Sequence, residues 1–291
     1  MRRIRFPVVD DRLRGLWDFN VLDGTETRLR RQLEVEATDP GRAEVLSQLA
    51  RAEGLRGEFA RGDALIDEAA RLGGDDDVAG ARIDLERGRL RRSSGDGESA
   101  RPLFESAYTS ALAAGQYFMA ADAAHMVALV ASDRDRFVDW TRRGIELAEA
   151  HETAAYWAGP LLNNLGWEYY EAGELEPALE AFERALQVRE GDPGNDDGLS
   201  LARYAVGKTL RGLGRADEAI PLLEQAVAWA TSENRPDGWF HEELAEDYAA
   251  TGREYDAREQ ARLAIPLLQA DDPAFADDGE RRASLEALAE R

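Results

Sequence analysis

The chain has 291 residues, with 58 acidic and 36 basic side chains and a formal net charge of −22 at pH 7. That charge repels phosphate groups, so it excludes a nucleic-acid binder that depends on a basic surface. Cysteine is absent, which excludes disulfides and cysteine-based metal centres, whereas apolar residues at 44% suffice for a packed core.

The N-terminal region, residues 1–41, has a helical pattern. Leu13, Leu16 and Trp17 are followed at helical spacing by Leu29 and Leu33. We expect capping helices here, because the ends of a helical array need a polar outer face. Residues 1–11 contain arginines but lack the apolar run of a secretory signal. The rest of the chain has no apolar stretch long enough to cross a bilayer. A cytoplasmic protein without a membrane partner is therefore expected.

Residues 42–268 contain a repeating triad: a small residue, an apolar residue four positions later, and alanine three positions after that. Successive triads begin 38, 41, 37, 41 and 38 residues apart. This spacing lies along one helical face, and small residues there allow a neighbouring helix to approach closely. The triads are Gly62/Ile66/Ala69, Ala100/Phe104/Ala107, Thr141/Ile145/Ala148, Ala178/Phe182/Ala185, Ala219/Leu223/Ala226 and Ala257/Ala261/Ala264.

A second helical run precedes the triads and ends in a glycine-bearing turn. Leu162, Leu165, Gly166 and Tyr169 lead into the turn at 172–174, and similar runs lead into turns at 212–214 and 251–252. Glycine after the last periodic residue is a helix stop. No segment alternates with period two, so the sequence predicts an all-α protein of about six antiparallel helix pairs without a sheet. Residues 269–291, with Leu285 and Leu288, are expected to form a C-terminal capping helix.

The run from Leu162 through Gly166 and Tyr169 to Ala178, Phe182 and Ala185 resembles the tetratricopeptide repeat (TPR). Pro193 lies near where that pattern often ends. The long period and the 161–166 segment are similar to the kinesin-light-chain type of repeat. The resemblance implies a right-handed superhelical solenoid that binds partners in its concave groove.

If the resemblance holds, one column of residues lines that groove, each one position after a small residue of a first helix. Its members are Arg51, Arg89, His125, Trp167, Lys208 and Glu246. Neighbouring inward positions add Gln48, Arg82, Arg92, Asp122, Asn163, Asn164, Tyr204 and Arg211. Cations, aromatic faces and amides suit carboxylates and an extended peptide backbone. Each also has a purely structural interpretation: Arg89 could pair with Glu86, and Trp167 or Tyr204 could be packing residues.

These residues predict a non-catalytic scaffold for an acidic or carboxylate-bearing peptide, with the ligand-binding set Arg89, Asp122, His125, Asn163, Asn164, Trp167, Tyr204, Lys208 and Arg211. Asn164 corresponds to the asparagine that holds a peptide carboxylate in chaperone-docking TPR proteins, but Ala121, His125, Leu201 and Ala205 stand where that clamp has its other residues. The resemblance to kinesin light chain implies an acidic or aromatic-acidic peptide.

Two alternatives remain open: a regulator that senses a small molecule or signal peptide in the groove, and an enzyme that uses the groove as its active site. His125 and Asp122, three residues apart, could form an acid–base pair. No metal or cofactor is expected. The segment 202–209 lacks the first glycine and preceding strand of a phosphate loop, and Ala245 replaces the second histidine of a zinc-protease helix that begins at His241.

Overall fold

The computed structural model describes residues 11–192 and 195–290, and over these ranges the protein is built from helices with no strand. The predicted all-α class is therefore confirmed. The chain divides into two compact units, which meet in sequence between Leu161 and Leu162. Pro193 lies outside the described residues.

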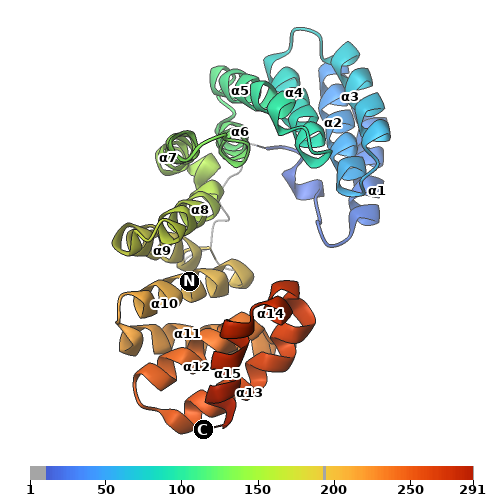
Figure 1. Cartoon of the computed structure of the whole chain (residues 1–291). Helices are drawn as coiled ribbons and strands as arrows, with labels where there is room; N and C mark the ends of the chain where they lie inside the picture. The colour runs from blue at the N-terminus through green and yellow to red at the C-terminus, as the bar shows by residue number, and fades with distance from the viewer. Residues whose placement is uncertain (1–10, 193–194, 291) are drawn as a thin grey trace, which may run out of the picture. The chain divides into compact units, whose positions relative to one another are not determined.

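The first unit begins with a short 3₁₀ turn and then forms three helix pairs. The turn η1 (Arg14–Leu16) precedes α1 (Leu22–Val35). The pairs are α2 (Asp39–Leu55) with α3 (Phe59–Gly73), α4 (Asp77–Ser93) with α5 (Gly97–Ala113), and α6 (Tyr117–Leu129) with α7 (Arg134–Ala150), followed by the 3₁₀ helix η2 (Glu152–Trp157). Successive helices pack against one another (Figure 1).

The second unit continues the same alternation. Helix α8 (Ala158–Glu171), which starts just before the boundary, is followed by α9 (Leu175–Glu190). The next pairs are α10 (Asp196–Gly212) with α11 (Ala216–Ser232) and α12 (Gly238–Ala250) with α13 (Glu254–Asp271). A short helix α14 (Pro273–Asp277) then leads to α15 (Gly279–Glu290). The six helix pairs agree with the predicted number.

The predicted turns end the first helices. At Gly173 the backbone φ is 76°, a left-handed conformation that glycine adopts without steric cost. The amide of Glu174 donates to the carbonyl of Tyr169 at 2.9 Å, and that of Gly173 donates to Tyr170 at 3.0 Å. This bonding satisfies the last carbonyls of α8 and reverses the chain toward α9.

Every predicted triad is buried on the second helix of its pair. Where the small position of the first helix is glycine, the central residue contacts it: a Cβ added to Gly88 would lie 2.5 Å from Phe104, and one added to Gly166 would clash with Phe182. Small residues are thus needed because the bulky side chain lies directly against the neighbouring backbone.

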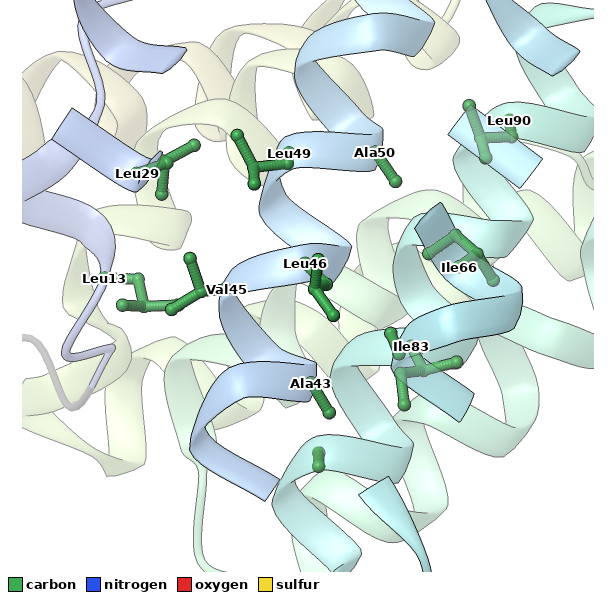
Figure 2. Packing of buried hydrophobic residues seen from close by; sticks show 12 residues of the cluster. Leu13, Leu29, Ala43, Val45, Leu46, Leu49, Ala50, Ile66, Ile83 and Leu90 are labelled. Atoms are coloured by element: carbon green, nitrogen blue, oxygen red, sulfur yellow. The ribbon is translucent and has the colours of Figure 1, made fainter. Parts of the chain in front are cut away.

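Helix α2 lies at the centre of the apolar cluster nearest the N-terminus, and a second cluster of the first unit is formed by α4, α5 and α6. In Figure 2, Val45 and Leu49 point toward Leu13 and Leu29, while Leu46 and Ala50 lie on the side of Ile66. The helical pattern predicted around Leu16 and Trp17 forms only the short 3₁₀ turn, and the following α-helix begins at Leu22. Leu13 and Leu29, both 1% exposed or less, anchor this N-terminal segment to the core.

Candidate binding face

The predicted column lies on the first helix of each pair. Arg51, Arg89 and His125 belong to α2, α4 and α6 of the first unit, and Trp167, Lys208 and Glu246 belong to α8, α10 and α12 of the second. We describe the two halves of the column separately.

In the first unit, Arg89 is bound on both sides by carboxylates. It donates to Glu86 at 2.7 Å and to Asp122 on the next first helix. Burial alone would lower the pKa of Arg89, but these two carboxylates outweigh it and raise the pKa. Gln48 also donates to Glu86 at 2.9 Å. The predicted ligand residues Arg89 and Asp122 therefore satisfy each other.

His125 lies beside an aromatic residue that the predicted column does not include. The centroids of the His125 and Trp157 rings are 5.2 Å apart. Burial lowers the pKa of His125 below 6.5, although Asp122 acts in the opposite direction. Burial therefore favours the neutral form of the His125 imidazole.

In the second unit, two predicted cations converge on one buried carboxylate. Lys208 and Arg211 both donate to Glu243, Arg211 at 2.8 Å. Glu243 is 1% exposed; burial would raise its pKa, but the two cations lower it overall. Arg211 also pairs with Glu246 at 2.8 Å, and Lys208 lies over the ring of Tyr204 at 5.7 Å.

Aromatic residues line the same part of the second unit. Trp167 packs edge-on against Phe182 at 5.1 Å between centroids, and its ring centroid is 6.3 Å from that of Tyr204. A pocket of about 360 Å³ brings these groups together. Its lining residues are Trp167, Tyr204, Lys208, Arg211, Trp239, Glu242, Glu243, Glu246 and Arg281.

The pocket therefore joins four of the predicted ligand residues: Trp167, Tyr204, Lys208 and Arg211. Asn163 and Asn164 are half-buried on α8 and are not among its lining residues. The remaining three, Arg89, Asp122 and His125, belong to the first unit.

Sequence reasoning named Glu86 as a possible partner of Arg89 and placed Asp122 among the inward residues, but it missed Glu243 as the partner of Lys208 and Arg211. Glu86, Asp122 and Glu243 each stand three residues before a column member, on the same helical face. Gln48 and Asn164 occupy equivalent positions on α2 and α8. This second column of acids and amides was a readable signal that the cations are paired within the fold.

Within the described residues, no cluster of three or more histidine, aspartate or glutamate side chains could hold a metal ion. Over the same ranges, none of the helices combines the length and apolar character that a membrane span requires.

Comparison with known proteins identifies the repeat. Two models of the tetratricopeptide repeat match the chain, one over residues 160–192 and the other over residues 201–232. A search of characterised protein sequences found no match.

Solved structures share the fold at low sequence identity. The apo form of RapI is 14% identical with a TM-score of 0.71, and the match covers 91% of this chain and 75% of that one. The STAND protein PH0952 from Pyrococcus horikoshii, which has a tetratricopeptide repeat sensor, is 13% identical with a TM-score of 0.70, covering 92% of this chain and 41% of that one. The quorum sensor NprR from B. thuringiensis is 11% identical with a TM-score of 0.56, covering 93% and 83%.

Proposed function

The chain is a tetratricopeptide-repeat protein, and from that premise we propose that it is a non-catalytic binding module for a protein or peptide partner. The proposed site is the pocket of the second unit, and the proposed ligand is a peptide segment that carries a carboxylate next to an aromatic or apolar side chain. The observation that carries this proposal is the convergence of Lys208 and Arg211 beside the aromatic faces of Trp167, Tyr204 and Trp239.

Arg211 can exchange one of its partners for a ligand. The Arg211 side chain is 30% exposed and that of its partner Glu246 is 28% exposed, whereas the side chain of its other partner, Glu243, is only 2% exposed. Burial raises the pKa of Glu246, and the negative charge of Glu243 adds to this despite the pairing with Arg211. Glu246 is therefore the weaker of the two partners, and a ligand carboxylate can take its place.

The aromatic and amide side chains near the pocket determine which groups the ligand needs besides its carboxylate. Backbone amides within the helices are already bonded, so affinity must come from side chains. The exposed parts of Trp167 and Trp239 offer flat apolar surface to a side chain of the peptide. Asn163 and Asn164, half-buried on α8, are proposed as amide contacts to the peptide backbone.

The proposal that the module is non-catalytic is supported by the pairing of two carboxylates on the binding face. Asp122 accepts from Arg89, and Glu243 accepts from two cations. Neither is therefore available as a general base.

Fluorescence anisotropy with labelled synthetic peptides tests the proposal. An acidic peptide with interspersed aromatic residues is compared with the same peptide in which glutamine and asparagine replace the acids. We expect the acidic form to bind about tenfold more tightly, and Lys208→Ala/Arg211→Ala to abolish that preference. Glu246→Gln should strengthen binding, because it removes the competing carboxylate. Arg215→Ala, which removes an exposed arginine paired with Glu218, is the matched control.

Ionic strength provides a second measurement on the same peptides. Affinity for the acidic peptide should fall steeply as salt is raised, because partly exposed charges are screened. Circular dichroism establishes that each variant keeps its helices. Binding that is insensitive to salt, or equal for the acidic and amidated peptides, would contradict the acidic preference.

Sensing of a small molecule is the second candidate function. PH0952 and NprR are both described as sensors, and the first unit of this chain contains a pocket of its own. Co-purification of a metabolite with the wild-type protein, together with no peptide binding, would favour this alternative.

A further inference from the structure

The first unit contains a partly enclosed pocket of about 150 Å³, separate from the peptide site proposed above. Its walls come from the N-terminal segment, α2, α4, α6 and η2. The residues that define its chemistry are Arg14, Trp17, Arg51, Glu86, Tyr156 and Trp157.

Two guanidinium groups at this pocket have little carboxylate to balance them. Arg14 forms no ion pair with any described residue. Arg51 lies 3.7 Å from Glu86, whose same oxygen already accepts from Gln48 and Arg89. Burial lowers the pKa of Arg51 and the neighbouring charge of Arg89 lowers it further, and together they outweigh the opposite effect of Glu86 and Asp122. The lining also includes Arg82, Asp11 and Asp122. Asp11 pairs with Arg82 and Asp122 with Arg89, so Arg14 and Arg51 are the cations of this pocket that an anionic ligand can pair with.

Aromatic faces surround the same two cations. The guanidinium of Arg14 is 5.1 Å from the ring centroid of Tyr156 and 5.5 Å from that of Phe19. That of Arg51 is 5.0 Å from the ring centroid of Trp17. The rings hold the cations in place without neutralising them, and they give the pocket flat apolar walls.

Two polar atoms of the lining residues are buried without a hydrogen-bond partner among the described residues. One is a donor, the indole Nε1 of Trp157, and the other is an acceptor, Oε2 of Glu86, whose residue is only 1% exposed. Buried polar groups of this kind cost free energy unless a partner is supplied. A hydrogen-bond donor and an acceptor that both lack partners at one pocket indicate a ligand that carries both an acceptor and a donor.

We propose that this pocket binds a small aromatic carboxylate that also carries a hydrogen-bond donor, a molecule the size of an aromatic hydroxy acid or amino acid. The carboxylate accepts from Arg51, Arg14 and the Trp157 indole. The hydroxyl or ammonium group donates to Oε2 of Glu86. The ring packs against Tyr156 and Trp17, two of the aromatic side chains that line the pocket.

Isothermal titration calorimetry with three related probes tests the proposal on the full chain. Phenyllactate has the ring, carboxylate and hydroxyl; phenylpropionate lacks the hydroxyl, and phenylpropanol lacks the carboxylate. We expect phenyllactate to bind most tightly and phenylpropanol to show no saturable binding. Arg51→Gln should weaken phenyllactate binding about tenfold and Trp157→Phe about threefold, because each removes one donor to the carboxylate.

Control variants separate this site from general effects on the fold. Arg143→Gln removes an arginine of the same unit that pairs with Asp139 on the exposed face of α7, and it should leave phenyllactate binding unchanged. The peptide-site variant Lys208→Ala/Arg211→Ala should also leave it unchanged, so failure of one proposal is distinguishable from failure of the other. Trp157→Phe keeps an aromatic ring, which makes it the conservative variant if Arg51→Gln does not fold.

Three results would overturn the proposal. The first is the absence of saturable phenyllactate binding up to about 10 mM, a concentration that detects affinities in the weak millimolar range. The second is binding that Arg51→Gln does not weaken, which would place the ligand elsewhere. The third is equal affinity for phenyllactate and phenylpropionate, which would remove the role assigned to Glu86.

Discussion

A glycine on a first helix lies directly against a bulky side chain of the second helix of its pair. Replacing one such glycine by alanine therefore tests this contact. In Gly88→Ala the new methyl group would lie 2.5 Å from Phe104, which is 0% exposed. We expect a loss of about 1–3 kcal/mol in the free energy of unfolding, because overpacking outweighs the gain in helix propensity. Urea denaturation followed by circular dichroism measures the difference.

Gly80 provides the matched control in the same helix. A Cβ at Gly80 would meet nothing within 4 Å, so Gly80→Ala should be neutral or stabilising by up to about 1 kcal/mol. If the two alanine variants were equally stable, the close approach to Phe104 would not be what selects glycine at position 88.

At the scale of the element, a cluster of ion pairs fastens the last helix to the helices before it. Arg281 of α15 donates to both carboxylate oxygens of Glu242 at 2.6 Å and to Asp272 at 2.7 Å. Only 7% of the Glu242 side chain is exposed, so Arg281→Gln would leave a nearly buried carboxylate without its bidentate partner. We expect amide protection in α15 to fall about tenfold or more, measured by hydrogen–deuterium exchange.

The neighbouring arginine, Arg282, tests whether the protection of α15 depends on the ion pairs of Arg281 or is lost when any arginine of this helix is replaced. Arg282 is on the same helix, and its contact with Glu286 is 3.9 Å between partly exposed side chains. Arg282 also donates to the backbone carbonyl of Ala276 at 2.8 Å, in an exposed hydrogen bond. Arg282→Gln should therefore reduce the protection of α15 much less than Arg281→Gln, because exposed contacts of this kind contribute little. Equal loss of protection in both variants would show that α15 is held by its apolar contacts alone, chiefly those of Leu285 and Leu288.

Helix pairing and its core could be predicted from the sequence because the triads repeat at nearly constant intervals. The acids three residues before the column indicate that its cations are paired, but the partners on neighbouring repeats could not be predicted, because they depend on the register between repeats. Lys208 and Glu243 are 35 residues apart, and Arg89 and Asp122 are 33 apart, whereas the triads recur every 37 to 41 residues. The pocket of the first unit was also missed, because Arg14 reaches it from an N-terminal segment without the repeat pattern.

At the scale of the whole molecule, one buried acid links stability to pH in a protein whose formal charge at pH 7 is −22. Asp247 on α12 is 0% exposed, and neither of its carboxylate oxygens has a hydrogen-bond partner among the described residues. Burial raises the pKa of Asp247 from 3.8 to about 7, an effect that Glu243 and Glu246 reinforce and Arg211 opposes.

The sign of the pH dependence follows from the direction of that shift. The unfolded chain releases the Asp247 proton near pH 4, but the folded protein keeps it until pH is about 7, so the unfolded state gains the charge first. The stability that this group contributes is fully present below about pH 4 and declines by about 1.4 kcal/mol per pH unit until pH approaches 7.

Asp247→Asn removes the titration, so the variant should gain stability relative to wild type as pH rises through this range. Chemical denaturation at pH 4.5, 5.5, 6.5 and 7.5, values spanning about the interval between the two pKa values, gives the slope. The exposed Asp277→Asn serves as control, and parallel curves for wild type and Asp247→Asn would mean that the Asp247 carboxyl ionises as readily in the folded protein as in the unfolded chain.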